Sequence, residues 1–345
     1  MKKLKLVILL TAMIAVIWVL AGCGQKAVNT QNQPPAKIKV GLVLDPVGRG
    51  DGGFNDAAYS GMVKAQKDLG NVIETKLVES HDVKELEKGI RTLAENKTDL
   101  IITMGYYFAE PLAKAAKDYP KTRFVLIDAD LPDLKAGSNI TCVTFKDNEG
   151  AFLAGAAAAL KSQTGNIGFV GGDEIPVVKN FETGYTAGAR YINPKIEVLC
   201  SYIGGGSQGF NDPAAARDLT VKQISGGADV IFHAAGISGK GMFEAVAAQQ
   251  KLAIGADADQ TFTVPEAQQA YILTSIIKGI DGAVEDVINR QVEKKLSGGY
   301  IKLGIKDGVQ TFAENAINKN MLAAIKPRLD EIKSKIAGGE IAVPE

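Results

Sequence analysis

From residue 37 onward the chain repeats one pattern of apolar and polar positions. Short runs rich in Val, Ile and Leu end at a turn, and each is followed by roughly ten to fifteen residues with apolar positions at helical spacing. This alternation is typical of a parallel α/β sheet. Many of the runs are continuously apolar, as expected of strands covered by helices on both faces. The predicted strands span residues 38–44, 72–78, 100–103, 124–127, 140–145, 167–170, 197–202, 230–233, 252–255 and 271–275.

The pattern is interrupted once, by a predicted helix of small residues at 150–160, and it begins again near residue 166. Two Rossmann-like lobes fit this interruption better than one large sheet, and the length of 345 residues suits two domains. Other helices are predicted at 83–96, capped by Asp82, and at 214–225. Ligands of open parallel sheets bind beyond the carboxyl ends of the strands. The residues that follow each strand are therefore the candidates for function.

Composition and charge exclude several classes of protein. Hydrophobic residues make up 46% of the chain and charged residues 23%, which excludes intrinsic disorder as the main state. The 39 basic and 39 acidic residues cancel, and no basic cluster lies beyond residue 5, so no nucleic-acid partner is expected. The two histidines and three cysteines are too dispersed for a zinc motif, so no metal is expected. Cys142 and Cys200 are expected as buried thiols, with a disulfide between them as the less favoured alternative.

The first 22 residues are predicted to be a targeting signal and not part of the folded protein. Three lysines within residues 1–5 precede an uncharged apolar run at 6–21, which matches a signal peptide. A membrane anchor helix is the alternative, but the run is shorter than the ~20 residues that a span usually needs. Leu20, Ala21, Gly22 and Cys23 resemble the lipobox of bacterial lipoproteins, in which cleavage precedes an acylated cysteine. We therefore expect a lipid on Cys23, followed by a flexible tether at residues 23–36 that holds the protein on the outer face of the cell membrane.

The loop after the first predicted strand is rich in glycine. Its residues from Gly48 to Gly53 satisfy the G-x-G-x-x-G spacing, but a dinucleotide fingerprint begins directly at the strand end, and here three residues intervene. An acidic side chain at this place would also repel a pyrophosphate. No cofactor is therefore expected. The loop is interpreted as one that presents Asp45, Phe54 and Asn55 to a neutral ligand, with the glycines permitting the turn.

Acidic residues follow three of the predicted strands. Asp45 follows the first strand, Asp128 and Asp130 follow the fourth, and Asp257 follows the ninth. If these acids converge on one crevice, they would suit a ligand rich in hydroxyl groups, because carboxylates accept hydrogen bonds from hydroxyls. They would oppose a phosphate. A calcium or magnesium site lacks the D-x-D-x-D-G spacing.

The chain offers no recognisable catalytic motif. G-x-S-x-G is absent, and no Ser, Cys or Lys lies beside a histidine in a nucleophile motif. His81 and His233 lie at the ends of predicted strands, where they could line the cleft, but a structural role for both is the favoured interpretation. Gly236 follows the eighth strand, where small residues would let a ligand approach the backbone, and Lys278 closes an apolar run.

These features together resemble the basic membrane protein family of bacterial lipoproteins, also called the PnrA-like or Med-like family. The resemblance covers nearly all of the chain after the signal peptide. The segments that carry it are, in order, DGGFNDAAYSGM, RFVLIDAD, VTFKDNEGAFLAGAAAAL, IGFVGGDEIPVVKNFETGYTAGA, ADVIFHAAGISGKGMFEAV, AIGADADQ and LTSIIKGID. One departure is that Gly52 and Gly53 stand where family members usually have Lys and Ser.

The resemblance implies a type I periplasmic-binding-protein fold with the ligand between two lobes. Its N-terminal lobe would comprise residues 37–147 and about 258–290, and its C-terminal lobe about 148–257 and 291–345. The resemblance further implies a purine nucleoside of the adenosine, guanosine or inosine type as ligand, and the permease subunits of an ABC importer as partners. The residues implied in the site are Asp45, Phe54, Asn55, Met104, Gly105, Asp128, Asp130, Phe181, Phe232, Gly236, Asp257 and Lys278.

Within this set the resemblance implies separate roles. The base would stack on Phe54 and a second aromatic residue, Phe181 or the less favoured Phe232. Its edge would bond to Asn55 and to Asp128 or Asp130.

The other implied residues lie around the sugar and along the pocket wall. Asp45, Asp257 and Lys278 would hold the ribose hydroxyls, and Met104 and Gly236 would line the pocket.

Other functions stay open from the sequence. A nucleoside hydrolase would need acids that hold a metal or a base near the glycosidic bond, and the first strand ends in no D-x-D motif. A binding protein for another small polar ligand, or a surface sensor or adhesin of the same fold, is a further alternative. The favoured interpretation is a binding protein and not an enzyme.

Overall fold

The computed structural model describes residues 36–345. The predicted signal peptide, the lipidation site Cys23 and all but the last residue of the tether lie outside the described residues. No helix in the described part of the chain is long and apolar enough to cross a membrane.

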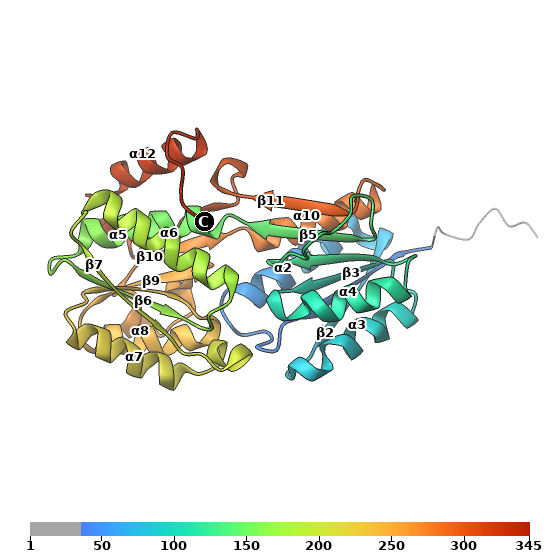
Figure 1. The fold of residues 1–345 in the computed structure, drawn as a ribbon, viewed down its shortest axis with the longest axis horizontal. Coiled ribbons are helices and arrows are strands. Elements are labelled where there is room, and N and C mark those ends of the chain that lie inside the picture. Colours follow the sequence, from blue (N-terminus) through green and yellow to red (C-terminus); the bar gives the residue numbers. More distant parts are fainter. Residues whose placement is uncertain (1–35) are drawn as a thin grey trace, which may run out of the picture. The chain divides into compact units, whose positions relative to one another are not determined.

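The first of two sheets has six strands in the order β11-β5-β4-β3-β1-β2, all parallel (Figure 1). Helices α2 and α10 cover one face of this sheet, and α3 and α4 cover the other. The strands are β1 (Ile38–Leu44), β2 (Ile73–Glu79), β3 (Leu100–Met104), β4 (Arg123–Ile127), β5 (Ile140–Phe145) and β11 (Gly299–Leu303). The helices are α2 (Phe54–Leu69), α3 (Leu86–Glu95), α4 (Ala109–Asp118) and α10 (Ile280–Val292).

The second sheet also has six strands, in the order β12-β10-β9-β8-β6-β7, and only β12 runs antiparallel to its neighbour among the described pairings. Helices α5, α6 and α12 pack on one face, and α7 and α8 on the other. The strands are β6 (Asn166–Gly171), β7 (Glu197–Tyr202), β8 (Val230–Ala234), β9 (Leu252–Asp257), β10 (Ile272–Lys278) and β12 (Gln310–Phe312). The helices are α5 (Asp147–Lys161), α6 (Pro176–Ile192), α7 (Pro213–Ser225), α8 (Gly239–Ala248), α9 (Glu266–Gln269), α11 (Lys319–Leu322) and α12 (Lys326–Ala337).

The predicted fold of two Rossmann-like lobes is confirmed, and the ten predicted strands lie within a few residues of β1–β10. The small-residue helix is α5, which is almost wholly buried between the second sheet and α6. The two helices approach so closely that a Cβ at Gly155 would clash with the carbonyl of Tyr185. Asp212 caps α7 by accepting a hydrogen bond from the amide of Ala215 (2.9 Å), with Pro213 in the first turn.

Two strands were not predicted. β11 is an edge strand whose residues alternate between partial burial and exposure, and β12 has only three residues. Neither forms the continuous apolar run that marks a buried parallel strand. Residues 299–312 therefore contribute one strand to each sheet, which the pattern of apolar residues did not predict.

The sheets divide the chain differently from the expected lobe boundaries. β10 was expected in the first lobe, but it pairs in parallel with β9 and belongs to the second sheet. β11 was expected in the second lobe, but it pairs with β5 of the first sheet. The chain therefore passes between the sheets after β5, after β10 and after β11. The pattern of apolar residues could not locate these crossings, because a buried strand has the same apolar pattern whichever sheet it joins.

Both cysteines of the described region are free thiols, as favoured from the sequence, since Cys142 lies on β5 of the first sheet and Cys200 on β7 of the second. Cys142 is buried, but the prediction of burial was wrong for Cys200, which is exposed. The reason is that β7 is an edge strand of the second sheet, with one flank unpaired.

Candidate functional site

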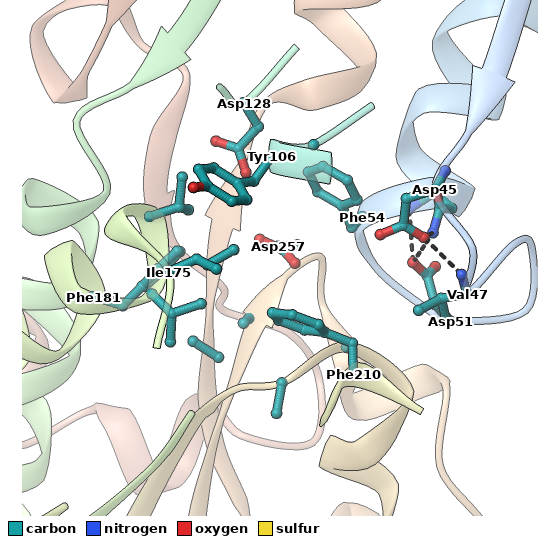
Figure 2. A pocket seen from close by; sticks show the side chains of 18 of the residues that line it. Asp45, Val47, Asp51, Phe54, Tyr106, Asp128, Ile175, Phe181, Phe210 and Asp257 are labelled. Atoms are coloured by element: carbon teal, nitrogen blue, oxygen red, sulfur yellow. Dashed lines mark hydrogen bonds between the residues drawn. The ribbon is translucent and has the colours of Figure 1, made fainter. Parts of the chain in front are cut away.

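A pocket lies between the two sheets, at the carboxyl ends of their strands, and encloses about 680 Å³ of space that is partly open to solvent (Figure 2). Loops after β1, β3 and β4 form one wall. The other wall is formed by residues at the start of α6, by the turn after β7, and by the carboxyl ends of β8, β9 and β10. This is the position expected for a ligand of parallel α/β sheets. The pocket lining includes nine of the predicted site residues: Asp45, Phe54, Asn55, Gly105, Asp128, Phe181, Gly236, Asp257 and Lys278.

Three predicted site residues lie outside the lining. Met104 ends β3 with its side chain in the core of the first lobe, and it is fully buried. Phe232 is fully buried on β8, packed behind Phe181 with their ring centroids 6.0 Å apart. Asp130 is exposed, so of the two acids after β4 only Asp128 faces the pocket.

The loop between β1 and α2 is held by a network of carboxylates. Asp45 Oδ1 accepts hydrogen bonds from the amide of Val47 (2.9 Å) and from Asn55 Nδ2 (2.8 Å). Asn55 Nδ2 also donates to Asp51 Oδ2 (3.2 Å), and Asn55 Oδ1 accepts from the amide of Asp45 (3.2 Å). The side chain of Asn55 is therefore engaged by the protein, and it positions Asp45 and Asp51 instead of offering a free amide to a base.

Asp51, in the glycine-rich loop, was not among the predicted site residues. Asp51 is only 3% exposed, and its carboxylate accepts hydrogen bonds from the amides of Gly53 (3.0 Å), Asn55 (2.7 Å) and Asp56 (3.2 Å). The signal available in the sequence was an acidic residue two to three positions before a helix start, which is where side chains cap free amides.

Lys278, at the end of β10, is the centre of the site's electrostatics. Its Nζ lies 2.6 Å from Asp128 Oδ1 and 2.8 Å from Asp147 Oδ1, and its side chain is 2% exposed. Asp128 belongs to the first lobe, whereas Asp147 opens α5 in the second. The nearby carboxylates raise the pKa of Lys278 even though burial opposes its charge, so the amine is protonated.

The aspartates that line the pocket outnumber Lys278, the one basic residue in the described lining, so their negative charge is not fully balanced. Burial raises the pKa of Asp45 to about 6 and that of Asp257 to about 7, from an ordinary value of 3.8. Lys278 acts in the opposite direction on Asp257, and Asp128 adds to the rise. Burial also raises the pKa of Asp128, although Lys278 lowers it. These carboxyls are poised to gain from a ligand that donates hydrogen bonds or carries positive charge.

Backbone geometry aims two of these acids at the pocket. Asp128 directly follows β4 with a φ of 64°, and Asp257 is the last residue of β9 with a φ of 68°. Both values lie in the left-handed region that Gly, Asn and Asp adopt most readily. The residues Gly105 and Gly236, near the ends of β3 and β8, also have positive φ. The backbone therefore has the same left-handed turn at corresponding strand ends of the two lobes, and the loops of both lobes face the pocket.

Aromatic side chains form much of the apolar lining. Phe54 and Phe210 point into the space that also holds Asp257 (Figure 2). Lys278 Nζ lies 5.3 Å from the ring centroid of Phe181 and 6.0 Å from that of Phe54. Flat aromatic walls with a polar group at their edge suit a flat heterocycle.

Phe210 and Tyr106 were not predicted as site residues. Both follow strands of the sheets, Tyr106 soon after β3 and Phe210 in a turn (Gly206–Phe210) after β7. The rule that ligands bind beyond strand ends could have found them. Three successive glycines, Gly204 to Gly206, have positive φ and carry Phe210 to the pocket.

Two hydrogen bonds join loops of the two lobes beside the pocket. The hydroxyl of Tyr107 donates to Asp173 Oδ2 (3.0 Å), and Lys240 Nζ donates to the carbonyl of Gly50 (3.0 Å). The first lobe supplies Tyr107 and Gly50, and the second supplies Asp173 and Lys240. The structure therefore has the lobes in contact across the pocket.

The histidines lie outside this pocket. His233 is 1% exposed, and burial lowers its pKa from 6.5 to about 4, so its ring is neutral and Nε2 donates to Gln260 Oε1 (2.8 Å). Its structural interpretation is confirmed. His81 Nδ1 lies 3.3 Å from the carbonyl of Pro46.

Comparison with protein families gives one match over nearly the whole described chain. The family model of PnrA-like substrate-binding proteins of ABC transporters, Bmp, matches residues 38–345. The ABC transporter nucleoside-binding protein BmpA of Lactococcus lactis is 31% identical over 349 residues, covering 96% of each chain. An uncharacterized lipoprotein of Pyrococcus abyssi is 33% identical over 356 residues, covering 96% of this chain and 84% of that protein.

Solved structures agree with this relationship. The crystal structure of an ABC transporter solute-binding protein from Aeropyrum pernix superposes with a TM-score of 0.76 at 27% identity, covering 89% of this chain and 94% of that one. The two-lobed fold is therefore that of ABC solute-binding proteins.

Proposed function

Because this chain belongs to the Bmp family of PnrA-like ABC transporter substrate-binding proteins, we propose that it captures nucleosides outside the cell and delivers them to an ABC permease. Purine nucleosides are the proposed ligands. The observation that carries the proposal is the composition of the pocket, in which aromatic walls lie beside carboxyls and one buried lysine.

The aromatic part of the pocket supports a base. A purine between Phe54 and Phe181 would gain stacking energy of ~1–3 kcal/mol, by analogy with bases stacked on aromatic side chains in single-strand binding. Asp128 would accept a hydrogen bond from the edge of the base, and Lys278, beside both rings, would polarise that edge.

The acidic part of the pocket supports a sugar. Asp45 and Asp257 have raised pKa values because burial leaves their charge poorly compensated, and ribose hydroxyls would donate hydrogen bonds to both. Lys278 would donate to a ribose oxygen. Asn55 would act through Asp45, which it holds in place by a hydrogen bond of 2.8 Å.

The proposed action is binding and release, with no bond made or broken. The ligand would stabilise the state in which the lobes meet, because its base and sugar contact residues of both lobes. The three chain crossings between the sheets would serve as the hinge. The closed form would then dock on the permease.

A lipid on Cys23 is proposed to hold the protein at the outer face of the cell membrane. The sequence around Cys23 supports this anchor, and the relative from Pyrococcus abyssi bears the name lipoprotein. A single acyl chain gives only marginal membrane binding, so stable anchoring would need more than one.

The test is the identity of the small molecule that copurifies with the chain expressed from Gly24 onward. The protein is purified without nucleosides and denatured, and the released material is read by ultraviolet absorbance and mass spectrometry. A stoichiometric purine nucleoside supports the proposal, and another stoichiometric small polar molecule contradicts it. Incubation with inosine separates the two activities, because free base would accumulate with a hydrolase and not with a binding protein.

A further inference from the structure

The glycine-rich loop before α2 resembles an anion-binding site whose backbone amides are already bonded to carboxylates of the protein itself. A helix N-terminus after the first strand of an α/β lobe is a common place for phosphate, because free amides converge there and the helix dipole favours negative charge. α2 has sixteen residues and begins at Phe54, whose side chain lines the pocket. A phosphorylated ligand in this pocket would find its natural partner at that helix end.

In this chain the amides are bonded to two aspartates instead. Asp51 accepts from the amides of Gly53, Asn55 and Asp56, as described above. Asp56 accepts from the amides of Gly50 (2.9 Å) and Gly52 (2.8 Å). Five amides of the loop and of the first helical turn are thereby satisfied by carboxylates of the loop itself.

The rest of the pocket adds repulsion rather than attraction. Asp45, Asp51, Asp128 and Asp257 line it, and Lys278 is the only basic residue among the described lining residues. Lys278 is itself paired with Asp128 and with Asp147. The carboxylates would therefore repel a phosphate, and no unpaired cation would offset its charge. The free-energy cost of removing the phosphate from water would also be uncompensated.

We propose that Asp51 is a specificity-determining residue, which fills the phosphate-binding position at the N-terminus of α2 and so restricts the pocket to ligands without a phosphate. The inference rests on the proposed function for the identity of the ligand. This role would explain why the loop is rich in glycine, because the turn that the glycines permit places the Asp51 carboxylate at the N-terminus of α2. It also means that a phosphoester hydrolysis must release the ligand from any nucleotide before this protein captures it.

The first arm of the test compares inosine with inosine 5′-monophosphate by calorimetry. The expected preference of the unaltered protein for inosine is at least about 100-fold, because placing like charges together costs several kcal/mol. Asp51→Asn should reduce that ratio at least tenfold. Asp130→Asn is the control, because Asp130 is exposed and lies outside the pocket lining, and it should leave the ratio unchanged.

The second arm needs no nucleoside. Asp51→Gly empties the site of its carboxylate, and inorganic phosphate should then raise the melting temperature of this variant but not that of the unaltered protein. If no nucleoside binds any form, the proposed function fails while this arm still decides the role of Asp51. The inference is overturned if the monophosphate binds the unaltered protein within tenfold of inosine. It is equally overturned if folded Asp51 variants gain neither monophosphate nor phosphate binding.

Discussion

Lys278 Nζ lies 2.6 Å from Asp128 Oδ1, and this ion pair joins the last residue of β10 in the second lobe to the turn after β4 in the first. Both side chains are nearly inaccessible to solvent, at 2% and 8% exposure. The pair thus links the lobes at the wall of the pocket, where a ligand would touch both partners. We therefore expect the stability of the fold, the closure of the lobes and ligand binding all to depend on this pair.

Replacing Lys278 by Met should destabilise the fold strongly. Asp128 and Asp147 would lose their shared cation while staying buried, and breaking a buried pair in this way costs about 3–5 kcal/mol. Denaturant unfolding of the ligand-free chain measures the effect. Lys64→Met is the control, because Lys64 pairs with Glu285 at the surface and its side chain is 60% exposed. Equal stability of the two variants would show that the buried pair is not structural.

Phe54→Ala should weaken purine nucleoside binding by about tenfold or more, because one stacking surface for the base is lost. Phe54 is partly exposed in the pocket and packs against the edge of the first lobe's core. Calorimetry of both forms with inosine measures the change. Phe262→Ala serves as the control, since Phe262 is 62% exposed and lies outside the pocket lining. An unchanged affinity in folded Phe54→Ala would remove Phe54 from the site.

The ligand-free protein should lose stability from Asp257 as the pH rises from about 4 to about 7. The pKa of Asp257 is raised to about 7 in the fold from 3.8, so the folded state holds the proton that the unfolded state releases. Asp257→Asn should therefore be less sensitive to pH in this window than the unaltered protein. Asp130→Asn, which changes an exposed acid, should keep the original slope of unfolding free energy against pH. Identical slopes for Asp257→Asn and the unaltered protein would refute the raised pKa.

Tyr107→Phe should speed ligand release, because the hydroxyl of Tyr107, a residue of the pocket lining, joins the two lobes by donating to Asp173. Loss of one hydrogen bond of about 0.5–1.5 kcal/mol corresponds to a few-fold to roughly tenfold faster dissociation. Stopped-flow measurement of nucleoside release gives the rate. Tyr119→Phe is the comparison, since its hydroxyl bonds to Glu95 within the first lobe (3.3 Å). A release rate unaffected by Tyr107→Phe would mean that this contact does not hold the lobes together.

Cys23→Ser should move the full-length protein from the detergent phase to the aqueous phase in phase partition, because the proposed acylation needs the thiol. Cys200→Ser is the control, as Cys200 is an exposed thiol of the folded part. Partition of Cys23→Ser into detergent would argue against a lipid at Cys23.

Much of the fold could be predicted from the sequence because most of its strands are short apolar runs that end at turns. β1, β5 and β7 begin and end where the pattern placed them. β11 and β12 escaped prediction because an alternating edge strand and a three-residue strand carry little apolar signal. The exchange of β10 and β11 between the lobes escaped it too, because pairing partners are a tertiary property.

The residues of the site also fall into those that could be predicted from the sequence and those that could not. Asp45, Asp128 and Asp257 could be found because each follows a strand whose end the sequence reveals. Asp51 and Phe210 also lie in loops after strands, but which residues of those loops reach the pocket depends on conformations set by glycines with positive φ. Sequence spacing also could not tell that Asn55 would be bonded to Asp45 and Asp51 rather than free for a ligand.

The most direct test of the nucleoside-binding account is calorimetric titration of the ligand-stripped chain from Gly24 onward with inosine, with hypoxanthine and with ribose. The account predicts one inosine bound per chain, at least tenfold tighter than either fragment, because the aromatic and acidic parts of the pocket each contribute. Binding of ribose alone as tightly as inosine, or no binding of any purine nucleoside, would contradict it.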